Sequence, residues 1–114
     1  MANEVSEHII EDRLRRKLEA KGFKVLKLVT PGHSGTPDRI ILRPKWSPGA
    51  PWVIELKRPG KTERRLQEIV RDDWRTRGVL VLDMVNTRQG VDELVRELIR
   101  QCQETANEGM AIDL

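Results

Sequence analysis

Two short strand-like segments flank a stretch with the length and spacing of one helix, and no other feature constrains the fold as strongly. Trp52–Lys57 (WVIELK) and Val79–Met84 (VLVLDM) are apolar runs typical of strands, and the second is typical of a strand covered on both faces. Between them, Glu63–Arg77 repeats apolar residues at helical spacing, and Gly78 provides a helix end. A helix that connects two strands of one sheet makes a right-handed crossover between parallel strands. The sequence therefore predicts an α/β fold.

The segments before and after this unit complete the predicted domain. A helix begins near the N-terminus, with Ser6 as its N-cap and Gly22 as its end. Two strands follow, and the second forms a hairpin with Trp52–Lys57 through a long loop rich in proline and glycine. The predicted bounds are Ser6–Lys21 for the first helix, Phe23–Val29 and Arg39–Arg43 for the two strands, and Val91–Gln103 for a last helix. This order predicts an αβββαβ core, a mixed sheet flanked by helices.

Length and charge describe one mildly basic domain. A chain of 114 residues fits a single core. We assign residues 1–104 to one domain and predict that residues 105–114, which lack periodicity, form a mobile tail. The net charge is +3, and two of the 18 acidic residues, Glu108 and Asp113, lie in the tail. Without them, 21 basic residues stand against 16 acidic ones, which leaves residues 1–104 at +5. This balance is compatible with nucleic-acid binding.

The scarcity of cysteine and histidine limits which metal the chain can bind. Cys102 is the single cysteine, so no internal disulfide or cysteine-rich zinc site can form, and we expect it to be an apolar residue of the last helix. With two histidines in all, carboxylates would have to hold any metal, which favours Mg²⁺ or Mn²⁺. No apolar run approaches the roughly 20 residues of a membrane span. The first eleven residues are too acidic for a signal peptide, so we expect a cytoplasmic protein.

Three charged residues lie where the predicted sheet would bring them together. Asp38 precedes the second strand, whereas Glu55 and Lys57 are two residues apart on the third and therefore share a face. One interpretation is a solvated Glu/Lys pair on an edge strand. The other is a site for phosphodiester hydrolysis, in which Asp38, Glu55 and the carbonyl of Leu56 hold a hard cation. Lys57 would then orient the attacking water and offset negative charge on the phosphate.

The motifs around these residues resemble a known family. Gly35–Arg39 (GTPDR), then Glu55–Lys57 (ELK), then Gln67 in the following helix resemble the PD-(D/E)xK nucleases, and most of all the small phage and bacterial VRR-NUC proteins. The resemblance runs from about residue 6 to residue 83 and implies a restriction-endonuclease-like fold. The loop at residues 46–51 departs from the pattern, because small relatives often have a short turn there.

The resemblance also implies a set of site residues. The catalytic residues would be Asp38, Glu55, Lys57, Glu11 and Gln67, and the metal ligands Asp38, Glu55, Leu56 and Glu11. In the first helix Glu11 matches the family's glutamate best, and Glu7 is the second choice. The alternative for Glu11 is an exposed acid paired with Arg15 at i+4. The alternative for Gln67 is an ordinary surface residue of its helix.

The implied function is a metal-dependent, structure-selective DNA endonuclease that acts on branched DNA such as four-way (Holliday) junctions. The expected cofactor is Mg²⁺ or Mn²⁺, and the expected working form is a homodimer, located in the host cytoplasm if the chain is phage-encoded. The alternatives are a non-cleaving nucleic-acid-binding domain with the same fold, or a nuclease directed at RNA. The residues expected to contact DNA phosphates are Arg39, Arg58, Lys61, Arg64 and Arg65.

Overall fold

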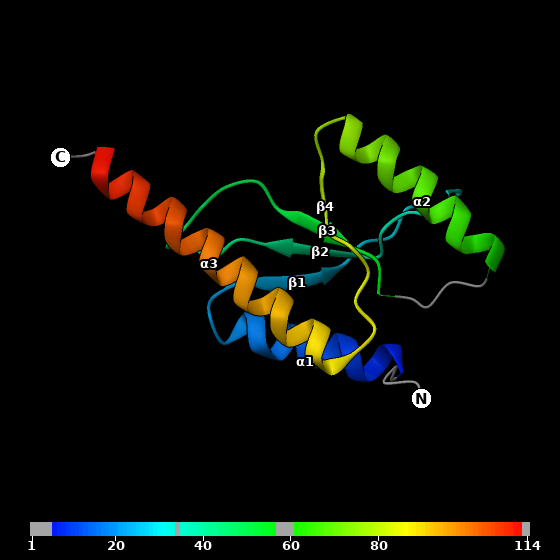
Figure 1. Cartoon of the computed structure of the whole chain (residues 1–114), viewed down its shortest axis with the longest axis horizontal. Helices are drawn as coiled ribbons and strands as arrows, with labels where there is room; N and C mark the ends of the chain where they lie inside the picture. The colour runs from blue at the N-terminus through cyan, green and yellow to red at the C-terminus, as the bar shows by residue number, and fades with distance from the viewer. Residues whose placement is uncertain (1–5, 34, 57–60, 113–114) are drawn as a thin grey trace.

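The computed structural model describes residues 6–33, 35–56 and 61–112. Their helices and strands follow the predicted order (Figure 1). The elements are α1 (Glu7–Glu19), β1 (Lys24–Lys27), β2 (Arg39–Leu42), β3 (Trp52–Ile54), α2 (Lys61–Thr76), β4 (Leu80–Val81) and α3 (Arg88–Ile112). In the described residues, no helix is both long enough and apolar enough to cross a membrane.

The four strands form one mixed sheet in the order β1-β2-β3-β4. The hairpin between β2 and β3 is antiparallel, with Arg39 opposite Ile54 and Ile41 opposite Trp52. Strand β4 is parallel to β3, as the crossover through α2 requires. The predicted fold class, an α/β core with a mixed sheet flanked by helices, is therefore confirmed.

Helices α1 and α3 pack together against one face of the sheet (Figure 1). Their apolar residues recur every three or four positions, so each helix turns one continuous stripe inward. The core that results is fully buried and draws on both helices and on the first three strands. It contains Ile10, Leu14, Leu18, Phe23, Val25, Ile41, Trp52, Ile54, Leu56, Val91, Val95, Leu98 and Cys102. The prediction that Cys102 is an apolar residue of the last helix is confirmed.

Both ends of α1 form as the sequence predicts. The hydroxyl of Ser6 accepts a hydrogen bond from the backbone N–H of Ile9 at 3.4 Å. At the other end, Gly22 has a φ of 93°, and the N–H of Phe23 donates to the carbonyl of Leu18 at 3.1 Å. This left-handed turn needs glycine, and it directs the chain from α1 into β1.

An ion-pair cluster ties α1 to α3 at the edge of the core. Arg13 donates to both carboxylate oxygens of Asp92, at 2.9 Å each. The ammonium of Lys17 lies 2.7 Å from the same carboxylate. The hydrogen bond from Arg13, and then that from Lys17, hold the pKa of Asp92 well below its usual range. The two helices are thus joined by charge as well as by apolar packing.

Two sequence predictions need correction. The run from Val79 to Met84 yields a strand of only two residues, and Leu80 is 39% exposed, so a strand covered on both faces was wrong. The reason is that β4 is the last strand of the sheet order. The last helix also extends beyond its predicted bounds, Val91–Gln103, and is helical as far as Ile112. Its apolar stripe ends at Cys102, but pairs such as Arg100 with Glu104 continue the helix without a core to cover.

Candidate active site

Asp38 and Glu55 meet across the β2–β3 hairpin. The pairing of Arg39 with Ile54 continues to Asp38 opposite Glu55 when it is extended by one residue. Residues directly opposite in an antiparallel pair share a face, with roughly 4.5–5.5 Å between their Cβ atoms. Because Ile54 and Leu56 point into the core beneath α1 and α3, Glu55 points to the opposite face. The two acids predicted as metal ligands therefore lie together.

The position of Asp38 is fixed by hydrogen bonds at its backbone and side chain. Its N–H donates to the carbonyl of Ile54 at 3.2 Å, and its carbonyl accepts from the N–H of Leu28 at 2.9 Å. The N–H of Leu56 donates to the carboxylate Oδ1 at 3.0 Å. This last bond holds the carboxylate in one orientation and brings the Leu56 peptide beside it. A carbonyl ligand from Leu56 is consistent with that placement.

Glu55 is connected to α2 through Gln67. The Nε2 atom of Gln67 donates to Oε2 of Glu55 at 2.9 Å, and Glu55 is only 7% exposed. The contact places α2 on the side of the sheet to which Glu55 points. Figure 1 shows α2 apart from α1 and α3. Gln67 therefore contacts a buried carboxylate of the candidate site, and its position is not that of an ordinary surface residue.

A close approach between a loop and α2 leads the chain into Asp38. Gly35 has a φ of 79°, which favours glycine. A Cβ atom at Gly35 would lie 2.9 Å from Cγ of Leu66 and 3.3 Å from its backbone. The hydroxyls of Thr30 and Thr36 contact each other and close the loop. The loop thus rests on α2, and this support positions the Pro-Asp pair that follows.

The two first-helix acids have different partners. Glu11 pairs with Arg15, its neighbour at i+4, at 3.2 Å, which is the alternative contact raised from the sequence. Glu7 instead lies 3.8 Å from Nη2 of Arg39. The same guanidinium donates to the carbonyl of Asp38 at 2.9 Å, and it lies 3.6 Å from the Asp38 carboxylate. Arg39 therefore links Glu7 to Asp38.

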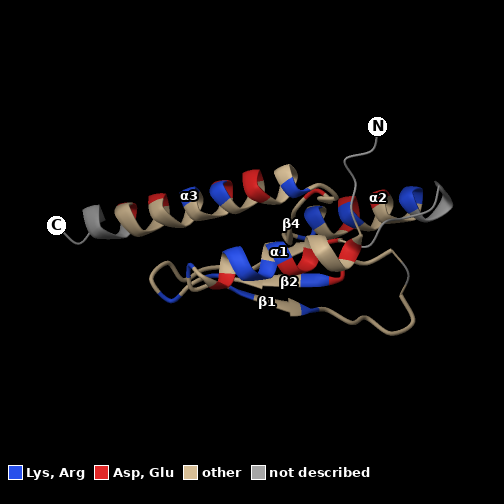
Figure 2. Cartoon of the chain, turned by 90° about the horizontal axis from the view of Figure 1, so that it is seen from below, with Lys and Arg blue, Asp and Glu red and all other residues tan. Residues whose placement is uncertain are grey.

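The basic residues expected to contact DNA fall into three groups. The side chain of Arg39 is only 12% exposed and points to Glu7 and Asp38, so it is not the open phosphate contact that we expected. Arg64 and Arg65 are exposed on α2, and Figure 2 shows basic residues along this helix. Lys57, Arg58 and the side chain of Lys61 lie outside the described part of the chain.

The donor set suits a hard cation and not zinc. In the residues that the structure describes, no group of three His, Cys, Asp or Glu side chains could hold a metal by itself. The site offers two carboxylates and the backbone oxygen of Leu56. Structural zinc sites need about four protein ligands and catalytic ones about three. Mg²⁺ is commonly held by one or two carboxylates and completes its coordination with water and substrate phosphate. The residues present therefore fit Mg²⁺ or Mn²⁺.

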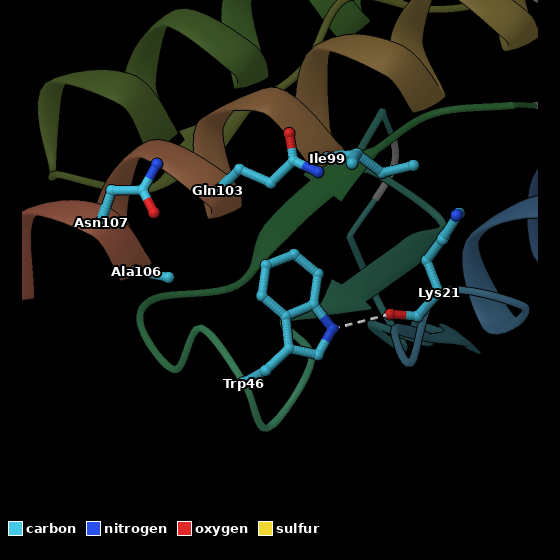
Figure 3. A pocket seen from close by; sticks show the side chains of 6 residues that line it. All are labelled: Lys21, Trp46, Ile99, Gln103, Ala106 and Asn107. Carbon is cyan, nitrogen blue, oxygen red and sulfur yellow. Dashed lines mark hydrogen bonds between the residues drawn. The ribbon is translucent and has the colours of Figure 1, made fainter. Parts of the chain in front are cut away.

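A pocket of about 570 Å³ lies away from these acids (Figure 3). Trp46, whose indole N–H donates to the carbonyl of Lys21 at 3.0 Å, faces Ile99 and Ala106 of α3 across this pocket. Trp46 follows β2, whereas Asp38 precedes it, so the pocket is at the opposite end of the strand. Its lining contains no carboxylate, and it is not the candidate active site.

The mixed sheet with helices on both faces, and an Asp/Glu pair where β2 meets β3, define a domain with a restriction-endonuclease-like core. No family model and no curated protein matches the sequence. A solved structure described as a VRR_NUC domain does match, with a TM-score of 0.64 and 28% sequence identity. The match covers 79% of this chain and 94% of that one. This similarity supports membership of the VRR-NUC family, as the motifs indicated, and it supports a nuclease-type domain.

Proposed function

We propose that the chain is a metal-dependent endonuclease that hydrolyses phosphodiester bonds in DNA and selects branched structures such as four-way junctions. The observation that carries this proposal is the Asp38 carboxylate, which the Leu56 N–H holds opposite the buried Glu55. Burying a carboxylate is costly, and Gln67 offsets part of that cost by donating to Glu55. In a nuclease-type domain, two carboxylates held on one face suit the cation that phosphodiester hydrolysis requires.

Each residue of the site has a distinct part in this proposal. Asp38, Glu55 and the Leu56 carbonyl would hold Mg²⁺ or Mn²⁺, which when bound polarises the phosphate and lowers the pKa of a water molecule. The N–H of Leu56 keeps the Asp38 carboxylate turned toward Glu55. Gln67 keeps the Glu55 carboxylate from rotating. Lys57 is proposed, from the motif, to stabilise the negative charge that develops on the phosphate.

For the first-helix acid, the contacts favour Glu7 over Glu11. Arg39 joins Glu7 to Asp38, whereas Glu11 is paired with Arg15 on its own helix. We therefore propose that Glu7→Gln impairs cleavage more than Glu11→Gln, which reverses the ranking expected from the sequence. The initial cleavage rates of the two variants at saturating metal decide this point. A larger loss in Glu11→Gln would restore the sequence-based assignment.

Selection by DNA shape is supported by the small size of the domain. Apart from the end of α3, the described elements build the sheet and the helices packed on it, and they include no separate module for reading bases. The exposed cations of α2, Arg64 and Arg65, can contact phosphates but cannot distinguish sequences through them. A nuclease of this kind would discriminate by the bending and branching of its substrate.

The test is a cleavage panel of duplex, flap, splayed and four-way junction DNA, with matched RNA substrates, in Mg²⁺, Mn²⁺ or EDTA. We expect cleavage of branched DNA that depends on the metal and is lost in Asp38→Asn. This variant keeps an oxygen that can accept from the Leu56 N–H, so folding should be preserved. Binding without cleavage in either metal would favour the non-cleaving domain, and cleavage of RNA alone would favour the RNA-directed nuclease.

We also propose a homodimer, because resolving a four-way junction needs two cuts and the chain has one candidate site. C2 dimers are the commonest soluble assembly. Of the two tryptophans in the hairpin segment, Trp52 is buried under the guanidinium of Arg43, 4.3 Å from its ring centre. Trp46 is 46% exposed and remains the candidate. Light scattering at micromolar concentrations tests the proposal, and a monomer that makes paired cuts would contradict it.

A further inference from the structure

The side of α2 that faces the sheet carries an arginine next to the candidate active site. Gln67, Val70, Arg71 and Trp74 are partly buried, whereas most other described positions of this helix are exposed. Residues four apart lie one above the other on a helix, so Arg71 is one turn beyond Gln67 on the same side. Because Gln67 donates to Glu55, Arg71 starts one helical turn from a contact with the candidate site.

Part of the Arg71 guanidinium is buried without a hydrogen-bond partner. Its Nε atom finds no acceptor among the residues that the structure describes, and no ion pair with a described residue involves Arg71. The next two arginines, Arg75 in α2 and Arg77 just after it, are different. Arg75 donates to the carbonyl of Val81 at 2.7 Å, and Arg77 pairs with Asp73 at 3.0 Å. On the sheet-facing side of α2, Arg71 is therefore a described arginine with a buried donor that the fold does not satisfy.

A buried donor without an acceptor destabilises a folded protein unless a ligand or water supplies the acceptor. A guanidinium is planar and fits two oxygens of a phosphate at once, which a lysine cannot do. The adjoining carboxylates and metal would act on a phosphodiester, so the acceptor brought to this place is a phosphate. We propose that Arg71 binds a backbone phosphate of the nucleic acid beside the one that is cleaved. This inference rests on the proposed function.

The salt dependence of binding can separate a phosphate contact from a structural role. Each phosphate contact contributes roughly 0.9 to the slope of log K against log salt for duplex DNA. In an Asp38→Asn background, which prevents cleavage, Arg71→Gln should lower that slope by about 0.9. It should also weaken junction binding roughly tenfold or more, since hydrogen bonds to charged groups are the strong ones. Arg77→Gln, at the far end of α2, is the matched control and should change the slope little.

Arg71→Lys adds a second criterion and covers the case in which Arg71→Gln does not fold. Lysine keeps the positive charge but cannot donate to two phosphate oxygens at once. We therefore expect weaker binding at an unchanged salt slope. Normal affinity and slope in both variants, while the wild type binds and cuts DNA, would overturn the inference and leave the proposed function intact. A wild-type chain that neither binds nor cuts nucleic acid would overturn both. Fluorescence anisotropy with a labelled four-way junction, from about 50 to 200 mM salt, supplies the measurements.

Discussion

The two faces of the sheet are built differently. On one face, α1 and α3 bury a continuous apolar core and are joined at its edge by Arg13 and Asp92. On the other face, α2 is attached by polar contacts, from Gln67 to Glu55 and from Arg75 to Val81. It also leaves apolar side chains exposed, with Ile69 at 57%.

This difference separates stability from chemistry. Burial of apolar area is the largest favourable term in folding, so the α1/α3 face supplies most of the folding free energy. The α2 face carries the proposed metal ligands Asp38 and Glu55, the Gln67 side chain that donates to Glu55, and Arg71 with its buried Nε donor. A rigid scaffold on one side can support such a site on the other. Substitutions on the α1/α3 face should therefore lower the unfolding free energy, whereas substitutions on the α2 face should mainly lower cleavage or binding.

The largest effect is expected from Leu98→Ala, in the buried stripe of α3. Removing a fully buried leucine side chain costs about 2–5 kcal/mol of unfolding free energy, because it loses burial and leaves a cavity. The matched control is Ile69→Ala on α2, which should change stability by less than about 0.5 kcal/mol. Urea denaturation followed by circular dichroism measures both. Equal losses in the two variants would break the comparison, because they would show that α2 is as firmly packed as α3.

The next largest effect is expected from Gly35→Ala, where the loop rests on α2. Alanine would combine an unfavourable positive φ with a clash against Leu66, at a cost of about 2–4 kcal/mol. Gly32→Ala is a close control, because its φ is 80° and nothing lies within 4 Å of the added Cβ. It should cost only about 1–2 kcal/mol. The difference between their unfolding free energies measures the contact with α2, and no difference would mean that the loop can move away.

A smaller effect, confined to catalysis, is expected from Gln67→Met. Methionine keeps the volume but cannot donate to Glu55, so the carboxylate loses the bond that orients it. Loss of such an outer contact typically costs about 10–100-fold in activity or metal affinity. Cleavage rates across a metal titration test this, with the exposed neighbour Glu68→Gln as control. A Gln67→Met variant that unfolds easily but cuts at the normal rate would assign Gln67 a structural role only.

Much of the fold could be predicted because its signals are local. The N-cap Ser6, the helix end at Gly22 and the crossover between β3 and β4 are each read from a few neighbouring residues. The meeting of Asp38 with Glu55 also follows from the sequence, since a hairpin fixes which residues are opposite. The exposure of Leu80 could not be predicted, because an apolar run carries no information about position in the sheet.

Side-chain partners were harder to predict than positions. An arginine after Pro-Asp is compatible both with an open phosphate contact and with a buried link, and the structure places Arg39 in the link between Glu7 and Asp38. The residues around Arg71 in the sequence do not predict its buried, unsatisfied donor, because the lack of a partner is a property of the assembled fold. Its spacing of four residues from Gln67 is the one feature of the sequence that could have indicated it.

The smallest effect is expected from Asp92→Asn, and it depends on pH. The bonds from Arg13 and Lys17 lower the pKa of Asp92 in the folded state, so its charge stabilises the fold above the pKa of an unfolded aspartate, about 3.9. That contribution is lost as pH falls below this value toward the lower folded pKa. Asp92→Asn should therefore have a lower Tm at pH 7 and a shallower decline below about pH 4. The effect is small, because the pair is solvent-exposed and therefore screened, and 1 M salt should reduce it further. Asp73→Asn removes the partner of Arg77, just after α2, and a larger loss of Tm at pH 7 there than in Asp92→Asn would contradict the idea that charge reinforces mainly the α1/α3 face.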